Sequence, residues 1–247
     1  MYRPFLSVLC VFCLTHLCFG IDGTTVLQKT DDKIIPRTAI FSIKVASKTA
    51  DQQRTYLIRG AKDGSEKTLL VVQAPTMVKD IVHLRKADNI WTYYPSIGKT
   101  NRMAYQSIFM DTTLSYGDII STELTRDYDV IDQTEETLDG QKTYKLILTP
   151  KPEVSGYAKI ICWVDKKTFL PIKRLYYSVS GVLLKTAKFS KIEFENNRIS
   201  SLTQTFEEPL RGRITVVQYT DFEFKNSLPD QWFNANTLQF LRPDSLK

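Results

Sequence analysis

The sequence predicts a mainly β fold of the α+β class, built on one antiparallel sheet of about ten or eleven strands. Three observations lead to this prediction. Apolar and polar residues alternate along many short segments, and turn residues separate these segments at short intervals. No stretch between the segments is long enough for the crossover helices of a parallel sheet. A meander of so many strands tends to curl or to close on itself.

The first twenty residues differ in character from the rest of the chain. A positive start at Arg3 leads into an almost wholly apolar run over 5–19, shorter than the about 20 residues that span a membrane. Small residues at Cys18 and Gly20 close this run ahead of Ile21. This order is typical of a secretory signal peptide over 1–20, with cleavage between Gly20 and Ile21. An uncleaved membrane anchor is the alternative.

Residues 21–247 are expected to form a single domain, monomeric and without a membrane span. After cleavage Cys162 is the only cysteine, so no internal disulfide can form and core packing must hold the fold. Within the apolar run 160–164, Cys162 is expected to be a buried small hydrophobic residue and not a nucleophile. The net charge is +6, but the basic residues are interleaved with acidic ones along the whole chain and form no basic cluster. This distribution does not favour a nucleic-acid partner.

Two kinds of local pattern follow along the chain. Residues 24–35 have the spacing of a short helix, with Thr25 and Gln28 at capping-box positions and Pro36 as its stop. From Arg37 onwards the period changes to two. The strands are predicted at 39–45, 53–61, 68–74, 81–86, 90–94, 100–105, 127–133, 143–149, 157–164, 172–178, 182–194, 199–206 and 215–224. Residues 69–72 and 160–164 are apolar on both sides, so both faces of the sheet must be partly covered.

One interior segment, 115–124, breaks the β pattern. Ser115 and Asp118 have capping-box spacing. The apolar residues of the segment then recur at helical steps, at Tyr116, Ile119, Ile120 and Leu124. The segment is either a plug that completes the core or a lid over a cavity, and the pattern by itself favours the plug.

Motifs that carry chemistry are missing from the mature chain. His83 is its only histidine, and one histidine with one cysteine cannot supply the usual zinc ligands. The sequence contains no nucleophile elbow, phosphate loop or dinucleotide fingerprint. We therefore expect no enzyme activity, no catalytic residues, no metal and no cofactor.

Residues 69–95 carry a resemblance to a known family. An apolar strand ending in Pro75 leads to the pattern L-x-K-x-D-N-x-W-x-Y-x-P over 84–95, which resembles the LolA-like outer-membrane lipoprotein-sorting proteins. Later blocks at 109–110, 115–119, 128–130, 163–166 and 181–190 extend the likeness over about 55–241. One departure is Asp111, which stands where the family usually has glycine.

The resemblance implies an incomplete antiparallel β-barrel whose concave face is covered by short helices. It also implies a periplasmic carrier, acting as a transport chaperone, that binds lipoprotein acyl chains or another lipid and sorts them toward the outer membrane. Its further partners would be inner- and outer-membrane transport proteins. The resemblance therefore favours the interpretation of 115–124 as a lid.

The hydrophobic residues of the expected cavity or lid are Trp91, Tyr93, Phe109, Met110, Leu114, Tyr116, Ile119, Ile120 and Leu124. Trp91 and Tyr93 share one face by alternation, and we expect that face to line the same cavity. The alternative function is a non-catalytic periplasmic sensor or scaffold that binds a protein partner. A chain that ends at Lys247 without an appended domain favours the carrier.

Overall fold

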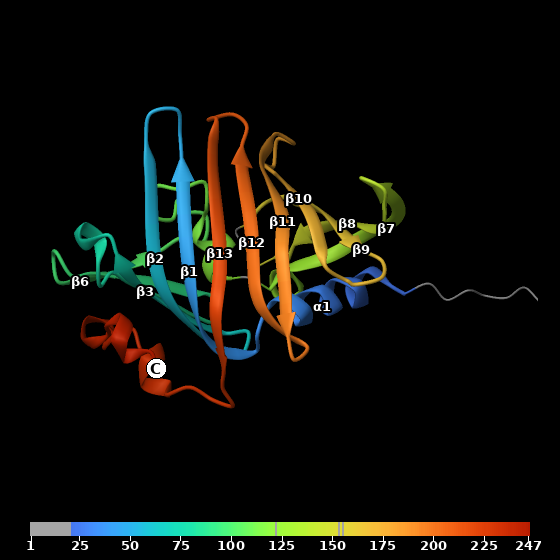
Figure 1. Ribbon diagram of the computed structural model, residues 1–247. Helices are drawn as coiled ribbons and strands as arrows, with labels where there is room; N and C mark the ends of the chain where they lie inside the picture. The colour runs from blue at the N-terminus through green and yellow to red at the C-terminus, as the bar shows by residue number, and fades with distance from the viewer. Residues whose placement is uncertain (1–20, 122, 153, 155) are drawn as a thin grey trace, which may run out of the picture.

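The computed structural model describes residues 21–121, 123–152, 154 and 156–247. The predicted signal peptide, with Gly20 at its end, lies outside the described residues, and Ile21 is the first residue inside them. Figure 1 shows one large curved sheet as the body of the molecule.

Thirteen antiparallel strands form this sheet, in the order β6-β5-β4-β3-β2-β1-β13-β12-β11-β10-β9-β8-β7. The sheet does not close, because β6 and β7 are its two unpaired edges in the described part of the chain. The strand bounds are β1 Thr38–Lys48, β2 Gln53–Asp63, β3 Lys67–Ala74, β4 Val82–Lys86, β5 Asn89–Tyr94, β6 Lys99–Met103, β7 Tyr128–Leu138, β8 Gln141–Pro150, β9 Lys159–Asp165, β10 Pro171–Tyr177, β11 Leu183–Glu195, β12 Arg198–Glu208 and β13 Arg213–Phe224.

This architecture confirms the predicted mainly β fold with an open antiparallel barrel. Each of the thirteen predicted segments overlaps an observed strand, so the expected total of ten or eleven strands was too low. The short strands β4, β5 and β6 each pair fully with their neighbours, although each has only five or six residues.

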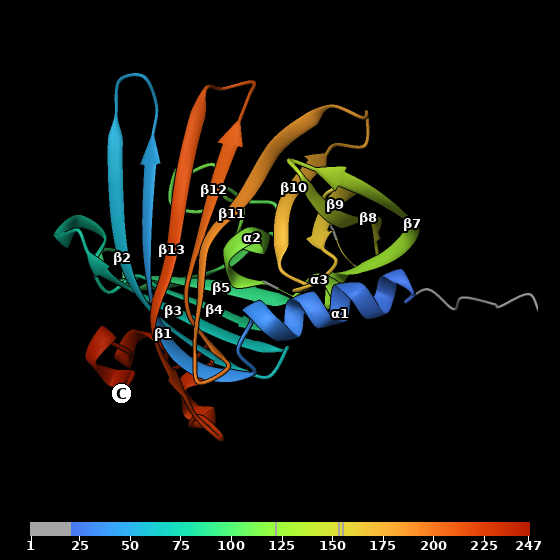
Figure 2. The same cartoon turned by 45° about the vertical axis from the view of Figure 1, so that its right-hand side comes forward.

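Two meanders make up the sheet, one from β1 to β6 and one from β7 to β13. The pairing of β1 with β13 joins them into one surface. The chain between the edge strands β6 and β7 contains two short helices, α2 Tyr116–Ile120 and α3 Leu124–Asp127. Figure 2 shows these helices inside the curve of the sheet, beside α1 Gly23–Ile34. Helices therefore cover the concave face, as the resemblance implied.

Alternation along the strands sorts apolar side chains into two clusters, one on each face. In β3, Leu70 and Val72 belong to the main cluster on the concave face. Leu69 and Val71 belong to an outer cluster on the opposite face. The two-sided apolar pattern is thus explained by cover on both faces.

The cover of the outer cluster comes from the C-terminal segment, residues 225–247. It contains three short 3-10 helices, η2 Asp230–Phe233, η3 Leu238–Phe240 and η4 Pro243–Ser245 (Figure 1, C-terminus). Phe233 and Leu238 are fully buried against the sheet. Sequence periodicity did not predict this packing, because 3-10 turns of three or four residues have no repeat long enough to recognise.

The N-terminal helix α1 matches the prediction except at its cap. Asp22 is the N-cap residue, and its carboxylate accepts a hydrogen bond from the Thr25 amide at 3.0 Å. Thr25, the predicted cap, instead donates its hydroxyl to Asp22. The helix ends at Ile34, and Pro36 follows as expected.

Candidate functional site

The predicted interior helix begins as expected but is divided in two. Ser115 and Asp118 form the predicted capping box: the Asp118 amide donates to Ser115 Oγ at 3.3 Å, and the Ser115 amide donates to Asp118 Oδ2 at 2.7 Å. The first helix, α2, ends at Ile120, and α3 begins at Leu124. We call α2 and α3 together the lid helices.

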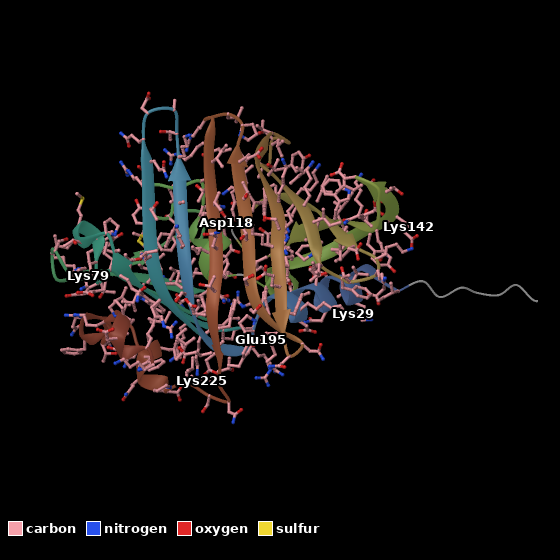
Figure 3. All side chains as sticks on the ribbon, in the orientation of Figure 1. Lys29, Lys79, Asp118, Lys142, Glu195 and Lys225 are labelled. Carbon is pink, nitrogen blue, oxygen red and sulfur yellow. The ribbon has the colours of Figure 1, made fainter. Side chains whose placement is uncertain are left out.

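Asp118 also attaches α2 to the sheet. Its Oδ2 accepts from Lys185 Nζ of β11 at 2.7 Å and from the Tyr157 hydroxyl at 2.8 Å. Both charged side chains are buried, with 4% of Asp118 and 8% of Lys185 exposed. In Figure 3 Asp118 is labelled near the centre of the view, whereas Lys79 and Lys142 lie toward opposite sides. The N-terminal end of α2 is therefore held by one buried ion pair.

A second carboxylate attaches α3 to α1. Asp31 Oδ2 accepts hydrogen bonds from the Thr125 amide at 2.9 Å and from the Thr125 hydroxyl at 2.8 Å. Its other oxygen, Oδ1, is buried without a partner among the described residues. Burial raises the pKa of Asp31 to about 6, although the Thr125 hydrogen bonds act in the opposite direction.

Asp31 is therefore expected to make stability depend on pH. Because its folded pKa lies above its ordinary value of 3.8, the charged form costs stability above pH 6, and this cost disappears below pH 4. In Asp31→Asn, an amide oxygen can still accept from Thr125. Raising the pH from 4 to 7 should lower the free energy of unfolding of the wild type relative to Asp31→Asn by about 2–3 kcal/mol.

Chemical denaturation across this pH range measures the difference. Asp32→Asn, an exposed neighbour on the same helix, is the control and should follow the wild type. His83 is common to all three proteins, so its titration cancels. If the free energy of unfolding changes with pH in the same way for the wild type and Asp31→Asn, Asp31 is not a buried carboxyl group with a raised pKa.

A cleft lies between the concave face and the three helices. Six of its apolar wall residues are Phe41, Ile119, Leu124, Ile160, Leu202 and Phe206. Its polar lining includes several tyrosines and one arginine, Arg174. The cleft holds about 60 Å³ of space for water-sized molecules, far below the roughly 300–1,000 Å³ of a typical small-ligand pocket.

A larger pocket of about 340 Å³ opens beside the inner cleft, at the rim of the sheet. Tyr105 and Tyr157 line both cavities and so separate them. Ile108 and Val179 line the rim pocket and are largely exposed, Val179 to 95%. We call this second cavity the rim pocket.

The four apolar residues predicted on the interior helix are all buried, but only two reach the cleft. Ile119 and Leu124 line it. Ile120 is fully buried in the main cluster outside the cleft. Tyr116 also lies outside it, and its hydroxyl is 2.9 Å from Thr92 Oγ1.

The predicted residues ahead of α2 lie beside this core and outside the inner cleft. Phe109 is fully buried and meets the ring of Tyr116 edge-on at 5.4 Å between centroids. Leu114 lines the rim pocket, and Met110 packs half-buried against the main cluster. Met110 and Asp111 have φ of 48° and 53°, in the left-handed region that glycine adopts most readily. This backbone is one in which the glycine that the resemblance leads us to expect at Asp111 would be unstrained.

The prediction that Trp91 and Tyr93 line the same cavity is wrong. Both pack against the outer cluster, on the face covered by the C-terminal segment. Their strand neighbour Ile90 belongs to the main cluster, and Thr92 contacts Tyr116 of α2. Alternation correctly put Trp91 and Tyr93 on one face, but that face is the outer one.

The two residues singled out for possible chemistry are both buried. His83 Nδ1 lies 2.9 Å from Thr92 Oγ1, and Nε2 has no partner among the described residues. Burial lowers the pKa of His83 to about 3, so the ring is neutral at ordinary pH. Cys162 is fully buried in the main cluster, as predicted, and burial raises the pKa of its thiol.

Sequence reasoning missed the charged and hydroxyl groups that organise the cleft: Asp31, Arg174, Lys185, Tyr157 and Tyr176. Two of them had a usable signal. Tyr176 and Arg174 are two residues apart on β10, so alternation places both on the buried face of that strand. The Asp118–Lys185 pair joins residues 67 positions apart, and no local pattern predicts it.

Comparison with solved structures defines the class of fold. A LolA superfamily protein from Nitrosomonas europaea is 24% identical, covers 87% of this chain and 98% of its own, and superposes with a TM-score of 0.78. A putative outer-membrane lipoprotein-sorting protein domain from Vibrio parahaemolyticus is 24% identical, with 88% and 98% covered and a TM-score of 0.76. A DUF1329 family protein from Desulfovibrio piger is also 24% identical, with the same coverage and a TM-score of 0.77. The fold is LolA-like, which confirms the resemblance.

A family model described as an uncharacterized protein matches residues 64–240, and the chain belongs to that family. No curated protein matches the chain. Among the residues that the structure describes, no helix is long and apolar enough to cross a membrane. The same residues contain no group of three or more histidine, cysteine or acidic side chains placed to hold a metal ion.

Proposed function

We propose that this chain is an exported carrier that shelters a hydrophobic ligand, the acyl chains of a lipoprotein or of another lipid, under its lid helices. The physical need for such a carrier is large. Each methylene that stays exposed to water costs about 0.8 kcal/mol, so an acyl chain crosses an aqueous space only when a protein wraps it. Apolar walls meet this need without any catalytic group.

The observation that carries the proposal is the pair of cavities on either side of Tyr105 and Tyr157. The inner cleft has apolar walls but is too small for an acyl chain, while the rim pocket is larger and opens between exposed apolar residues. Outward movement of the lid helices would join the two cavities into one channel. The two helices have only five and four residues, and elements this short open locally at a lower cost than the strands of the sheet.

The remaining parts of the proposal follow from the predicted signal peptide and the fold. Residues 1–20 direct export to the periplasm, and residues 21–247 act as a single monomeric domain without catalysis. The ligand is passed toward the outer membrane between inner- and outer-membrane partners. The name of the similar Vibrio parahaemolyticus domain, a putative outer-membrane lipoprotein-sorting protein, agrees with this direction.

Mass spectrometry of the exported protein tests this function. The protein is purified without detergent, its intact mass is recorded, and its solvent extract is analysed for lipid. We expect a mature chain that begins at Ile21 and an extract that contains an acyl lipid. A protein that carries no lipid and does not bind a fluorescent acyl probe is not a carrier of this kind.

A further inference from the structure

Arg174 is a buried cation with two nitrogen atoms that have no hydrogen-bond partner in the described part of the chain. It lies on β10, is only 6% exposed, and lines the inner cleft. Its Nε and Nη2 atoms have no hydrogen-bond partner among the described residues. No acidic group of the described chain lies within ion-pair distance of it, whereas Lys62, the other cation that lines the cleft, is paired.

Among the buried cations that line the two cavities, only Arg174 is unpaired in the described part of the chain; Arg85 is also buried without an ion pair, but it lies outside both cavities. Lys62 Nζ lies 2.8 Å from Glu123, and Lys185 Nζ lies 2.7 Å from Asp118. The charge of Arg174 acts on the carboxyl group of Asp31, but the two side chains form no ion pair. Asp31 Oδ2 instead accepts its hydrogen bonds from Thr125. A guanidinium is permanently charged, and burying its charge without a partner is costly. The site is therefore incomplete without an anion.

The geometry of the unused atoms indicates which anion fits. Nε and Nη2 form one edge of the guanidinium, and their two N–H groups point in parallel, the arrangement that binds a carboxylate or phosphate through two hydrogen bonds. The Phe189 ring lies 4.8 Å from the Arg174 guanidinium carbon and supports the group from one side. The guanidinium is thus held in place before any ligand arrives.

Apolar side chains form part of the wall that Arg174 shares. Ile160, Leu202 and Phe206 line the same cleft from β9 and β12. A small hydrated anion would gain nothing from such walls, whereas an amphiphile would place its chain against them.

We propose that the cleft binds an amphiphile with an oxyanion head group, a carboxylate or a phosphate, whose head is held by Arg174 and whose acyl chain lies along the apolar wall. This inference rests on the proposed function and narrows its ligand. A neutral ester of the same chain lacks the charge that Arg174 requires, so it binds less tightly.

The test compares a fluorescent polyunsaturated fatty acid with its methyl ester at pH 8, where the acid is ionised. The wild type is expected to bind the acid about tenfold or more tightly than the ester. Arg174→Met should bind both equally, and it should remain folded because an apolar residue replaces an unpaired buried charge. Lys173→Met, the adjacent residue, whose ammonium lies over the Trp163 ring, is the control and should keep the preference.

Competition with inorganic phosphate or acetate separates a lipid head group from a free anion. Neither small anion should displace the fatty acid when it is added at the concentration at which the fatty acid saturates the protein. Equal binding of acid and ester by the wild type overturns the inference but leaves the carrier function intact. This comparison uses the wild-type protein alone, so it does not depend on whether a variant folds. Retained preference in Arg174→Met, or displacement by phosphate alone, also overturns it. Absence of binding by both probes removes the carrier function as well.

Discussion

Replacing Lys185 by methionine is expected to lower the free energy of unfolding by about 3–5 kcal/mol, because it leaves the Asp118 carboxylate buried without its counter-charge. Only 4% of the Asp118 side chain is exposed in the folded protein. The same substitution removes the hydrogen bond from Lys185 Nζ to the Thr113 carbonyl at 2.5 Å. Both losses act at the beginning of α2, so that helix should loosen first.

Denaturant titration of the purified variants measures this effect. Lys188→Met is the matched control, since Lys188 lies on the same strand but pairs with Glu207 on the surface, with 60% of its side chain exposed. Its loss should change stability by no more than about 0.5 kcal/mol. Adding Asp118→Asn to Lys185→Met should recover part of the stability, because the orphaned charge is then removed. Equal effects of Lys185→Met and Lys188→Met would show that the buried pair does not hold α2.

A charge placed at Ile119 is expected to weaken ligand binding more than it weakens the fold. Ile119 is 2% exposed and lines the inner cleft from α2. If α2 is a lid, Ile119→Asp can hydrate its charge by local opening, so its cost is limited to the free energy of that opening. Binding of an acyl probe should fall by about tenfold or more, because the charge faces the chain.

Ile43→Asp supplies the comparison for Ile119→Asp. Ile43 is also an isoleucine, is also 2% exposed, and lies on the central strand β1, which cannot open locally. Its substitution should cost more than about 4 kcal/mol and unfold much of the population. Thermal unfolding and probe binding are recorded on both variants. If Ile119→Asp unfolds as completely as Ile43→Asp, the helix is a core plug.

Local patterns predicted most of the fold. Strand alternation, turn residues and the Ser115–Asp118 capping box depend on residues close in sequence, and the structure has all of them. Alternation also gave the correct partition of β5 into two faces. It could not say which face is concave, because curvature depends on the pairing of β1 with β13 across the whole chain. Trp91 and Tyr93 were therefore assigned to the wrong side.

The polar parts of the site depend on contacts between distant segments. Asp31 meets Thr125 across 94 residues, and Lys185 meets Asp118 across 67. The sequence shows single charged residues within apolar segments, but it does not predict which distant residue each of them contacts. The C-terminal segment was missed for a similar reason, since Phe233 and Leu238 are buried by a sheet formed far earlier in the chain.

Hydrogen exchange of the lid helices, with and without a saturating fatty acid, tests the central claim most directly. Without ligand, the amides of α2 and α3 should exchange through local opening, faster than those of β1 and β13, which require global unfolding. Binding of the fatty acid should slow exchange in the lid helices and leave the outer cluster, with Trp91 and Tyr93, unchanged. Exchange of α2 and α3 only by global unfolding, unaffected by the fatty acid, would contradict a ligand-binding cleft closed by a lid.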